Sequence, residues 1–183
     1  MVNTEKTEPN QILNQTRKII IERLRKDGST EGGKDGMDCS LLVFNQDRTQ
    51  LSFAAANNPV FIVNPNRTEW PVNSLPFGEG RGGAEFKPDK MPVGKHDNDE
   101  ESFTLNTTVL QKGDVIYTLT DGFPDQFGGD KGKKYMIKNL KELLLQIAHL
   151  PVLEQEQKLA EEFDKWKGEN EQVDDVCIIG VRI

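Results

Sequence analysis

The sequence predicts an α+β fold, in which a sheet or sandwich of antiparallel strands is flanked by helices. Three observations lead to this prediction. A helical apolar pattern opens the chain, several short strand-like runs follow, and two more helical patterns precede a last strand. No internal repeat or domain boundary interrupts the 183 residues, so we expect one compact domain with its own core.

The first expected element is a helix near the N-terminus. Pro9 suits its first turn, and Asp27-Gly28 is expected to end it. The apolar residues of this segment recur at helical spacing, and we expect their stripe to pack on a sheet: Ile12, Leu13, Ile19, Ile20 and Leu24. Residues 29–36 are polar and glycine-rich, which predicts a flexible connection.

The pattern then changes to that of strands. Three short runs joined by tight turns, residues 38–45, 51–56 and 60–63, predict an antiparallel meander. Residues 103–110 alternate between apolar and polar, which predicts a half-buried strand. Through a turn at Lys112-Gly113, this strand is expected to pair with the next one, which ends at Asp121.

The least regular stretch lies between these strands, at residues 64–102. It contains a glycine-rich run, residues 78–83, that suggests a phosphate-binding loop. The run lacks the Gly-Lys-Ser/Thr ending of such loops, and no buried strand leads into it. A surface loop is therefore the favoured interpretation.

Helical patterns return after Asp121. Residues 123–129 predict an irregular loop, and two helices follow. Pro151 is expected to open the second of them and Gly168 to end it. The apolar faces of the two helices are marked by Leu140, Leu143, Leu144 and Ile147, and by Leu159, Phe163 and Trp166.

The composition of the chain argues against several classes of function. A net charge of -7 and a pI near 5.0 argue against binding to nucleic acid or to an anionic membrane surface. No apolar run is long enough to span a membrane, and the N-terminus lacks the apolar core of a signal peptide. Cys39 and Cys177 both lie in apolar runs, which predicts reduced, buried thiols. We therefore expect a cytoplasmic location.

Two acidic elements are the candidate site. The strand at residues 115–119 leads to Asp121-Gly122, and Asp174-Asp175 precedes the last strand. Two strands that each carry Asp at one end can place hard oxygen ligands around one divalent cation. The alternative remains open that Asp-Gly is a turn and Asp-Asp a solvated loop.

Seven pieces, in order along nearly the whole chain, resemble those of a known family. They are residues 36–38, 53–59, 91–94, 112–114, 120–122 and 127–129, and finally Asp174-Asp175. In this order and spacing the chain resembles the metal-dependent type 2C protein phosphatases, specifically their SpoIIE-like serine phosphatase branch. Asn57-Asn58 stands where many relatives carry Gly-His.

The resemblance implies a β-sandwich flanked by helices, with a two-metal Mn²⁺ or Mg²⁺ centre. It implies that Asp121 and Asp174 are the catalytic, metal-binding carboxylates and that Gly122 and Asp175 belong to the same metal site. The implied reaction is hydrolysis of phosphoserine or phosphothreonine by a metal-activated water. The implied partners are a phosphorylated protein substrate and an upstream sensor or regulatory segment.

The chain departs from the family pattern at its N-terminal end. It contains no Gly-His-Gly element, and Glu5, Glu8 and Asp35 have no matching context. We therefore expect an N-terminally incomplete fold, with residues 1–183 as the C-terminal portion of a SpoIIE-like phosphatase domain and with impaired activity. One alternative is a non-catalytic phosphatase-like module that binds a phosphoprotein and regulates it. A weaker one is an unrelated α+β protein.

Overall fold

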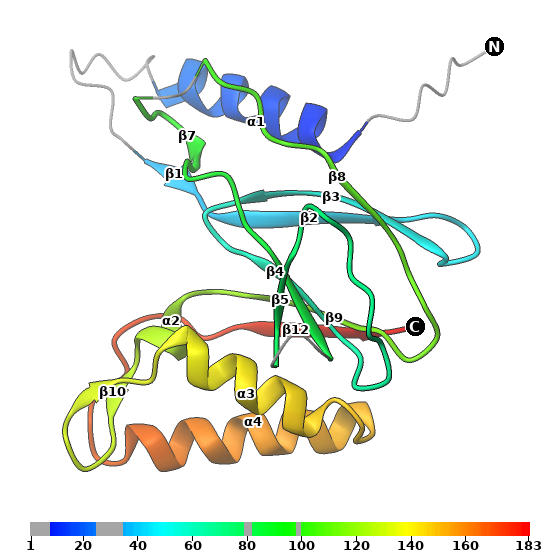
Figure 1. Cartoon of the computed structure of the whole chain (residues 1–183). Coiled ribbons are helices and arrows are strands. Elements are labelled where there is room, and N and C mark those ends of the chain that lie inside the picture. The colour runs from blue at the N-terminus through cyan, green and yellow to red at the C-terminus, as the bar shows by residue number, and fades with distance from the viewer. Residues whose placement is uncertain (1–7, 25–34, 79–81, 98–99) are drawn as a thin grey trace. The chain divides into compact units, whose positions relative to one another are not determined.

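The computed structural model describes residues 8–24, 35–78, 82–97 and 100–183 (Figure 1). The chain divides into two compact units, and each is described by itself. Unit 1 comprises residues 1–59 and 87–110, and unit 2 comprises residues 60–86 and 111–183. The expected helix end at Asp27-Gly28 and most of the expected connection at residues 29–36 lie outside the described residues.

In its described residues, unit 1 contains one helix and two small antiparallel sheets. Its sheets have the strand orders β2-β3-β8 and β1-β7. The elements are α1 (Pro9–Leu24), β1 (Gly36–Met37), β2 (Cys39–Phe44), β3 (Gln50–Ala56), β7 (Val93–Gly94) and β8 (Asn106–Val109). The hairpin of β2 and β3 confirms the first part of the predicted meander.

Helix α1 packs on this unit as expected, but with a different stripe. Leu13 and Arg17 are buried, whereas Ile12 is 36% exposed and Ile19 is 43% exposed. Leu13 lies in a core that α1 and the strands share: Leu13, Ala54, Ala56, Met91, Val93 and Phe103. The prediction that these two isoleucines are buried was therefore wrong. The buried face of α1 is instead the one that carries Leu13 and Arg17.

The charged residue on that buried face is held by neutral groups. The Arg17 guanidinium donates to the backbone oxygen of Glu101 and contacts Met91 Sδ at 3.2 Å. Its central carbon lies 4.7 Å from the centre of the Phe103 ring. An arginine can be buried in this way because its long apolar stem packs while its planar head bonds and stacks.

Unit 2 is a five-stranded antiparallel sheet, with strand order β12-β9-β4-β6-β5, and the helices that cover it (Figure 1). Its strands are β4 (Val60–Val63), β5 (Leu75–Phe77), β6 (Gly83–Phe86), β9 (Val115–Leu119) and β12 (Ile178–Arg182). Its other elements are α2 (Gly122–Asp125), α3 (Ile137–Ile147), α4 (Val152–Lys167) and a hairpin of β10 (Phe127–Gly128) and β11 (Lys133–Lys134).

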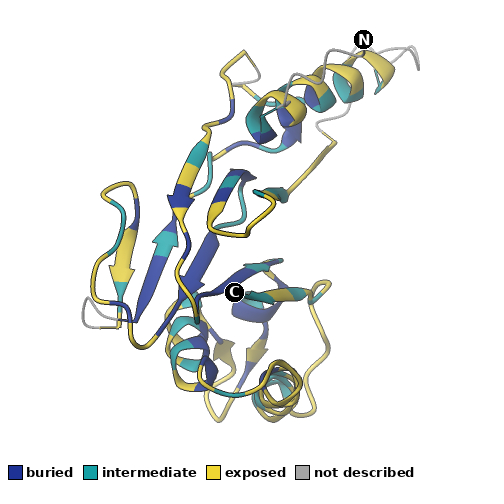
Figure 2. Ribbon diagram, turned by 90° about the vertical axis from the view of Figure 1, so that its right-hand side faces the viewer, coloured by how far each residue is buried: buried dark blue, intermediate teal, exposed yellow. Residues whose placement is uncertain are grey.

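The core of unit 2 lies between its sheet and its helices. Phe61 from β4 and Tyr117 from β9 pack with Leu140 and Leu144 from α3, and all four are buried. Figure 2 shows the chain coloured by burial, with buried segments in dark blue. The two predicted helices are confirmed, with Pro151 at the start of α4 and Gly168 at its end. The antiparallel sheets and flanking helices confirm the predicted fold class.

Two predicted strand pairings were wrong. Strand β4 does not continue the meander, because it pairs with β6 on one side and β9 on the other. All four of its residues are buried, as in a central strand. Strand β8 does not pair with β9 but with β3. The turn expected to join them bonds elsewhere, since Gly113 N donates to Ile183 O.

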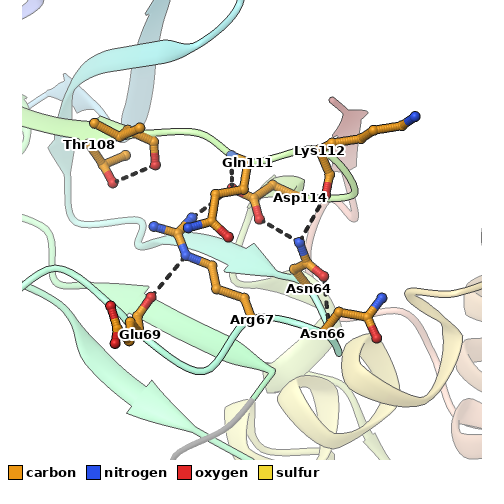
Figure 3. A network of polar contacts seen from close by, with 9 residues as sticks. Asn64, Asn66, Arg67, Glu69, Thr108, Gln111, Lys112 and Asp114 are labelled. Carbon is orange, nitrogen blue, oxygen red and sulfur yellow. Dashed lines mark hydrogen bonds and ion pairs between the residues drawn. The ribbon is translucent and has the colours of Figure 1, made fainter.

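A buried polar network occupies the turn before β9 (Figure 3). Asp114 is fully buried, and its carboxylate accepts bonds from Arg67 Nη1 at 2.7 Å and Asn64 Nδ2 at 2.9 Å. The backbone N–H of Gln111 adds a third bond at 2.9 Å. The Arg67 head also lies 4.6 Å from the centre of the Trp70 ring. The network ties the loop after β4 to the start of β9.

The irregular stretches hold more structure than expected. Strands β5 to β7 lie within residues 64–102, and α2 with its hairpin replaces the expected loop at residues 123–129. In the glycine-rich run, Gly83 begins β6, and a Cβ there would lie 2.3 Å from the Phe77 ring. This glycine therefore serves packing; residues 79–81 lie outside the described residues. None of the described helices is long and apolar enough to cross a lipid bilayer.

Candidate functional site

The candidate site lies in unit 2, where the end of β9 lies beside the start of β12. The two strands pair antiparallel, with Ile178 opposite Leu119. The pairing continues beyond the strands, since Thr120 N donates to Cys177 O at 3.0 Å. The chain on either side of this bond contains Asp121 and the Asp174-Asp175 pair. Residues more than fifty positions apart in sequence are therefore neighbours.

The two acidic elements touch through Gly122. A Cβ added at Gly122 would lie 2.4 Å from Asp175 O and 3.1 Å from a methyl carbon of Val176. Both distances are shorter than ordinary van der Waals contact, so a larger residue at this position would push the 175–176 backbone away. Glycine at position 122 is thus explained by close approach of the two chain segments.

The carboxylate of Asp121 is exposed and stands at the start of α2. Asp121 occupies the N-cap position of this helix, but its side chain makes no capping hydrogen bond. Only its backbone oxygen takes part, accepting a bond from Asp125 N at 3.0 Å. The carboxylate is therefore not used to stabilise the helix, although Asp at this position commonly is.

Asp174 and Asp175 lie in an exposed turn before β12. Asp174 Oδ1 accepts a bond from the Asp175 N–H at 2.7 Å, and Gln172 Nε2 donates to Asp174 O at 2.8 Å. These bonds are local to the turn. Its connection to β9 is made by Thr120, whose hydroxyl contacts Asp175 O and Cys177 N.

A second connection comes from Gln126, a residue that no motif in the sequence marks as part of a site. Its side chain is fully buried between α2 and the segment before Asp174. Gln126 Nε2 donates to Glu171 O at 2.9 Å, and Gln126 Oε1 accepts from Val173 N at 3.3 Å. Both partners are backbone groups, 45 and 47 residues away in the sequence. No local sequence pattern could therefore predict these hydrogen bonds.

The donor types of the site suit a hard cation, but the described residues do not complete a metal centre. Carboxylate and carbonyl oxygens are the ligands that Mn²⁺ and Mg²⁺ prefer. However, no three His, Cys, Asp or Glu side chains come together as a metal-binding group in the described ranges. Two other carboxylates are otherwise engaged: Asp125 pairs with Lys134 at 2.8 Å, and Asp38, in unit 1, accepts a bond from Asn57.

Both cysteines are free, and one of them is not buried as predicted. Cys39 is half-buried in β2, and burial, with a smaller contribution from the charge of Asp38, raises the pKa of its thiol. Cys177 is exposed, which corrects the expectation of a buried thiol. It lies just before β12, in the turn that carries the acidic pair, rather than within the sheet.

A pocket of about 670 Å³ opens beside the site, between α4 and the strands β9 and β12. Its wall is mainly apolar, with Tyr117, Leu159, Phe163, Val176 and Ile178 among the lining residues. Strand β12 pairs with β9 on one side only, and no described residue pairs with its other edge. The pocket therefore adjoins an open sheet edge.

Comparison with solved structures shows the fold. The SiaA-PP2C domain of Pseudomonas aeruginosa matches with a TM-score of 0.79 and 23% identity, over 98% of this chain and 63% of that one. The phosphatase domain of the cell fate determinant SpoIIE from Bacillus subtilis matches with a TM-score of 0.51 and 16% identity, over 100% of this chain and 76% of that one.

A third solved structure, the RsbU and RsbW domains of a Mycobacterium tuberculosis protein, has a TM-score of 0.55 and 15% identity. The match covers 94% of this chain and 46% of that one. The chain thus spans less than two thirds of the length of the first of these relatives and less than half of the third.

Comparison of sequences identifies the family. No curated protein sequence matches the chain. The family model of Stage II sporulation protein E (SpoIIE) matches residues 1–183, which is the whole chain. The antiparallel sheets and helices of the structure match those of PP2C phosphatase domains. The chain therefore belongs to the SpoIIE family and has the fold of a PP2C-type phosphatase domain.

Proposed function

We propose that residues 1–183 are the C-terminal portion of a SpoIIE-like domain that hydrolyses phosphoserine or phosphothreonine on a protein substrate, with Mn²⁺ or Mg²⁺ as cofactor. The observation that carries this proposal is the pairing of β9 with β12, which brings Asp121-Gly122 beside Asp174-Asp175. An unrelated protein with two ordinary acidic turns has no need of this juxtaposition. The family match supports the same reaction class.

In this proposal the Asp121 and Asp174 carboxylates are catalytic metal ligands, and Gly122 and Asp175 belong to the same site. Support comes from exposure: both carboxylates face solvent, and that of Asp121 is not used as a helix cap. Gly122 has the small size that lets its neighbours approach closely.

The ligand set has to be completed by groups outside the described residues. Hard cations take about six or more oxygen ligands, and the described residues form no group of even three ionisable ligands. The open edge of β12 and the apolar pocket beside it offer a place where a further strand can pair and pack. We therefore expect the chain alone to bind Mn²⁺ weakly and to turn over little substrate.

The same gap in the ligand set favours a second candidate function. A phosphatase-like fold with an incomplete metal centre can bind a phosphoprotein and regulate it without hydrolysing it. In either case the proposed partner is a phosphorylated protein. The greater length of the matched chains is consistent with a sensor or regulatory segment beside this one. The proposed location is the cytoplasm.

The test compares residues 1–183 with the longest protein that contains them. Phosphate release from a phosphoserine protein and from an aryl phosphate is measured with and without Mn²⁺. We expect turnover by the longer protein and little by residues 1–183 alone. In the longer protein, Asp121→Asn should lower turnover by about a hundredfold or more, since even supporting residues of metal sites contribute ten- to hundredfold. Asp130→Asn, at an exposed carboxylate of the hairpin tip, is the matched control.

Three results would decide against parts of this proposal. Strong turnover by residues 1–183 alone would contradict the incomplete ligand set. Tight Mn²⁺ binding by residues 1–183 in titration calorimetry would do the same. A longer protein that binds phosphoprotein but does not hydrolyse it would favour the regulatory binding module.

A further inference from the structure

The acidic turn before β12 has few contacts that hold it in place. Residues 171–175 are all exposed, and the bonds of Gln172 and Asp174 remain within the turn. Where this turn lies relative to Asp121 therefore depends on contacts from elsewhere in unit 2. Two side chains supply them: Thr120, at the end of β9, and Gln126, at the end of α2.

Gln126 has the geometry of a clamp. Its carboxamide is fully buried and bonds in both directions, with Nε2 donating to Glu171 O at 2.9 Å and to Phe127 O at 3.0 Å. Its Oε1 accepts the N–H of Val173, the residue before Asp174. A buried amide that satisfies a donor and an acceptor of one remote segment fixes both the distance and the direction of that segment.

The backbone of Gln126 is itself held firmly. Its carbonyl oxygen accepts bonds from Trp166 Nε1 at 3.0 Å and from Tyr135 N at 2.9 Å. Trp166 also binds the β10–β11 hairpin, since Gly129 N donates to Trp166 O at 2.8 Å. The clamp is thus anchored to α4 and to the segment just before α3.

We propose that Gln126 is a positioning residue that sets where Asp174 and Asp175 lie relative to Asp121, by holding residues 171–173 against the end of α2. Asp121 begins the short helix that Gln126 ends, so one side chain links the two acidic elements of the site. The significance of this role for catalysis rests on the proposed phosphatase function. The positioning itself does not, and it is tested without turnover.

The test is hydrogen exchange of the backbone amides in residues 1–183, with Gln126→Met as the variant. Methionine has a similar length and no hydrogen-bonding amide, so the core is filled while the three bonds are lost. Amide exchange of Val173 and of the following residues to Cys177 should accelerate about tenfold or more, since the net loss of roughly one hydrogen bond already corresponds to a tenfold change. The exchange is measured where both variant and parent are fully folded.

A matched control exists in the same unit. Gln155 is also buried, accepts from Tyr117 at 2.5 Å through Oε1, and donates to Leu150 O at 2.8 Å through Nε2. Gln155→Met should therefore lower the free energy of unfolding about as much as Gln126→Met does. It should leave amide exchange at residues 173–177 unchanged.

The outcomes are separable. Acceleration at residues 173–177 in Gln126→Met alone supports the positioning role, whether or not the longer protein proves to be a phosphatase. Equal acceleration in both variants, or none in Gln126→Met, overturns it. If the longer protein is active, Gln126→Met should lower its Mn²⁺-dependent turnover by about tenfold, whereas Gln155→Met should not.

Discussion

The hydroxyl of Thr120 bridges the two segments that carry the acidic residues: it accepts a hydrogen bond from Cys177 N at 2.9 Å and donates one to Asp175 O at 2.8 Å. The backbone N–H of Thr120 bonds to Cys177 O in addition. One residue at the end of β9 thus makes three bonds to the turn before β12. This arrangement prolongs the strand pairing up to Asp121.

Removal of the Thr120 hydroxyl should loosen this junction. Thr120→Val keeps the shape of the side chain and loses both hydroxyl bonds, so we expect the free energy of unfolding to fall by about 1–2 kcal/mol in urea titrations. Thr120→Ser keeps the hydroxyl, so its free energy of unfolding should fall by less than that of Thr120→Val. If the two variants were equally stable, the hydroxyl would not be what holds the turn.

A methyl group at position 122 should separate the two acidic segments. In Gly122→Ala the new carbon would meet Asp175 O at 2.4 Å, and we expect a loss of about 1–3 kcal/mol, typical of overpacking. The control is Gly180→Ala in β12, where the nearest atom, in the Tyr117 ring, is 3.2 Å away. That variant should lose less than about 1 kcal/mol. Equal losses would contradict the proposed close approach.

The buried ion pair of unit 2 should matter far more than an exposed one. Asp114→Ala leaves the Arg67 charge buried without its carboxylate, and we expect a loss of about 3–5 kcal/mol. Asp125→Ala breaks a pair with Lys134 in which both side chains are more than 40% exposed, and the loss should stay below about 1 kcal/mol. Thermal or urea unfolding of the two variants tests the contrast, which similar losses would contradict.

Stability should fall in strongly alkaline solution, in part because of a buried tyrosine. Burial raises the pKa of Tyr117 above its ordinary value of 10.0, and the charge of Arg182 only partly offsets this. Because the folded-state pKa is the higher one, the contribution of Tyr117 is complete below pH 10 and is lost as pH rises above it.

Tyr117→Phe should reduce that alkaline slope, by up to about 1.4 kcal/mol per pH unit, the value for one proton. It should also cost about 1 kcal/mol at neutral pH, since the bond to Gln155 is lost. Unfolding in urea between pH 8 and pH 11, values chosen to bracket the ordinary tyrosine pKa, measures both effects. An unchanged slope would show that Tyr117 does not titrate with a raised pKa.

Local patterns in the sequence determined the type and approximate bounds of most long elements. The apolar periodicity of α3 and α4, with Pro151 and Gly168 at the ends of α4, predicted two helices that the structure contains. The β2–β3 hairpin was likewise predicted from its turn. These features depend on contacts between residues close in sequence, which a single sequence displays directly.

The choice of strand partners was decided only by the tertiary structure. Strands β4 and β8 were each assigned to a sequence neighbour, and each pairs with a strand farther along the chain or farther back. An apolar run predicts that a strand is buried but does not predict which strand pairs with it, because the same backbone hydrogen bonds form between any two strands.

For the candidate site, too, the sequence predicted one part and only the tertiary structure showed the other. The sequence by itself determined which residues to examine, since Asp121-Gly122 and Asp174-Asp175 each adjoin a strand and match the order of a known family. Only the tertiary structure decided that these elements are neighbours and that Thr120 and Gln126 join them. The physical reason is that both side chains bond to backbone groups, which every residue carries, so their partners leave no trace in the residue pattern.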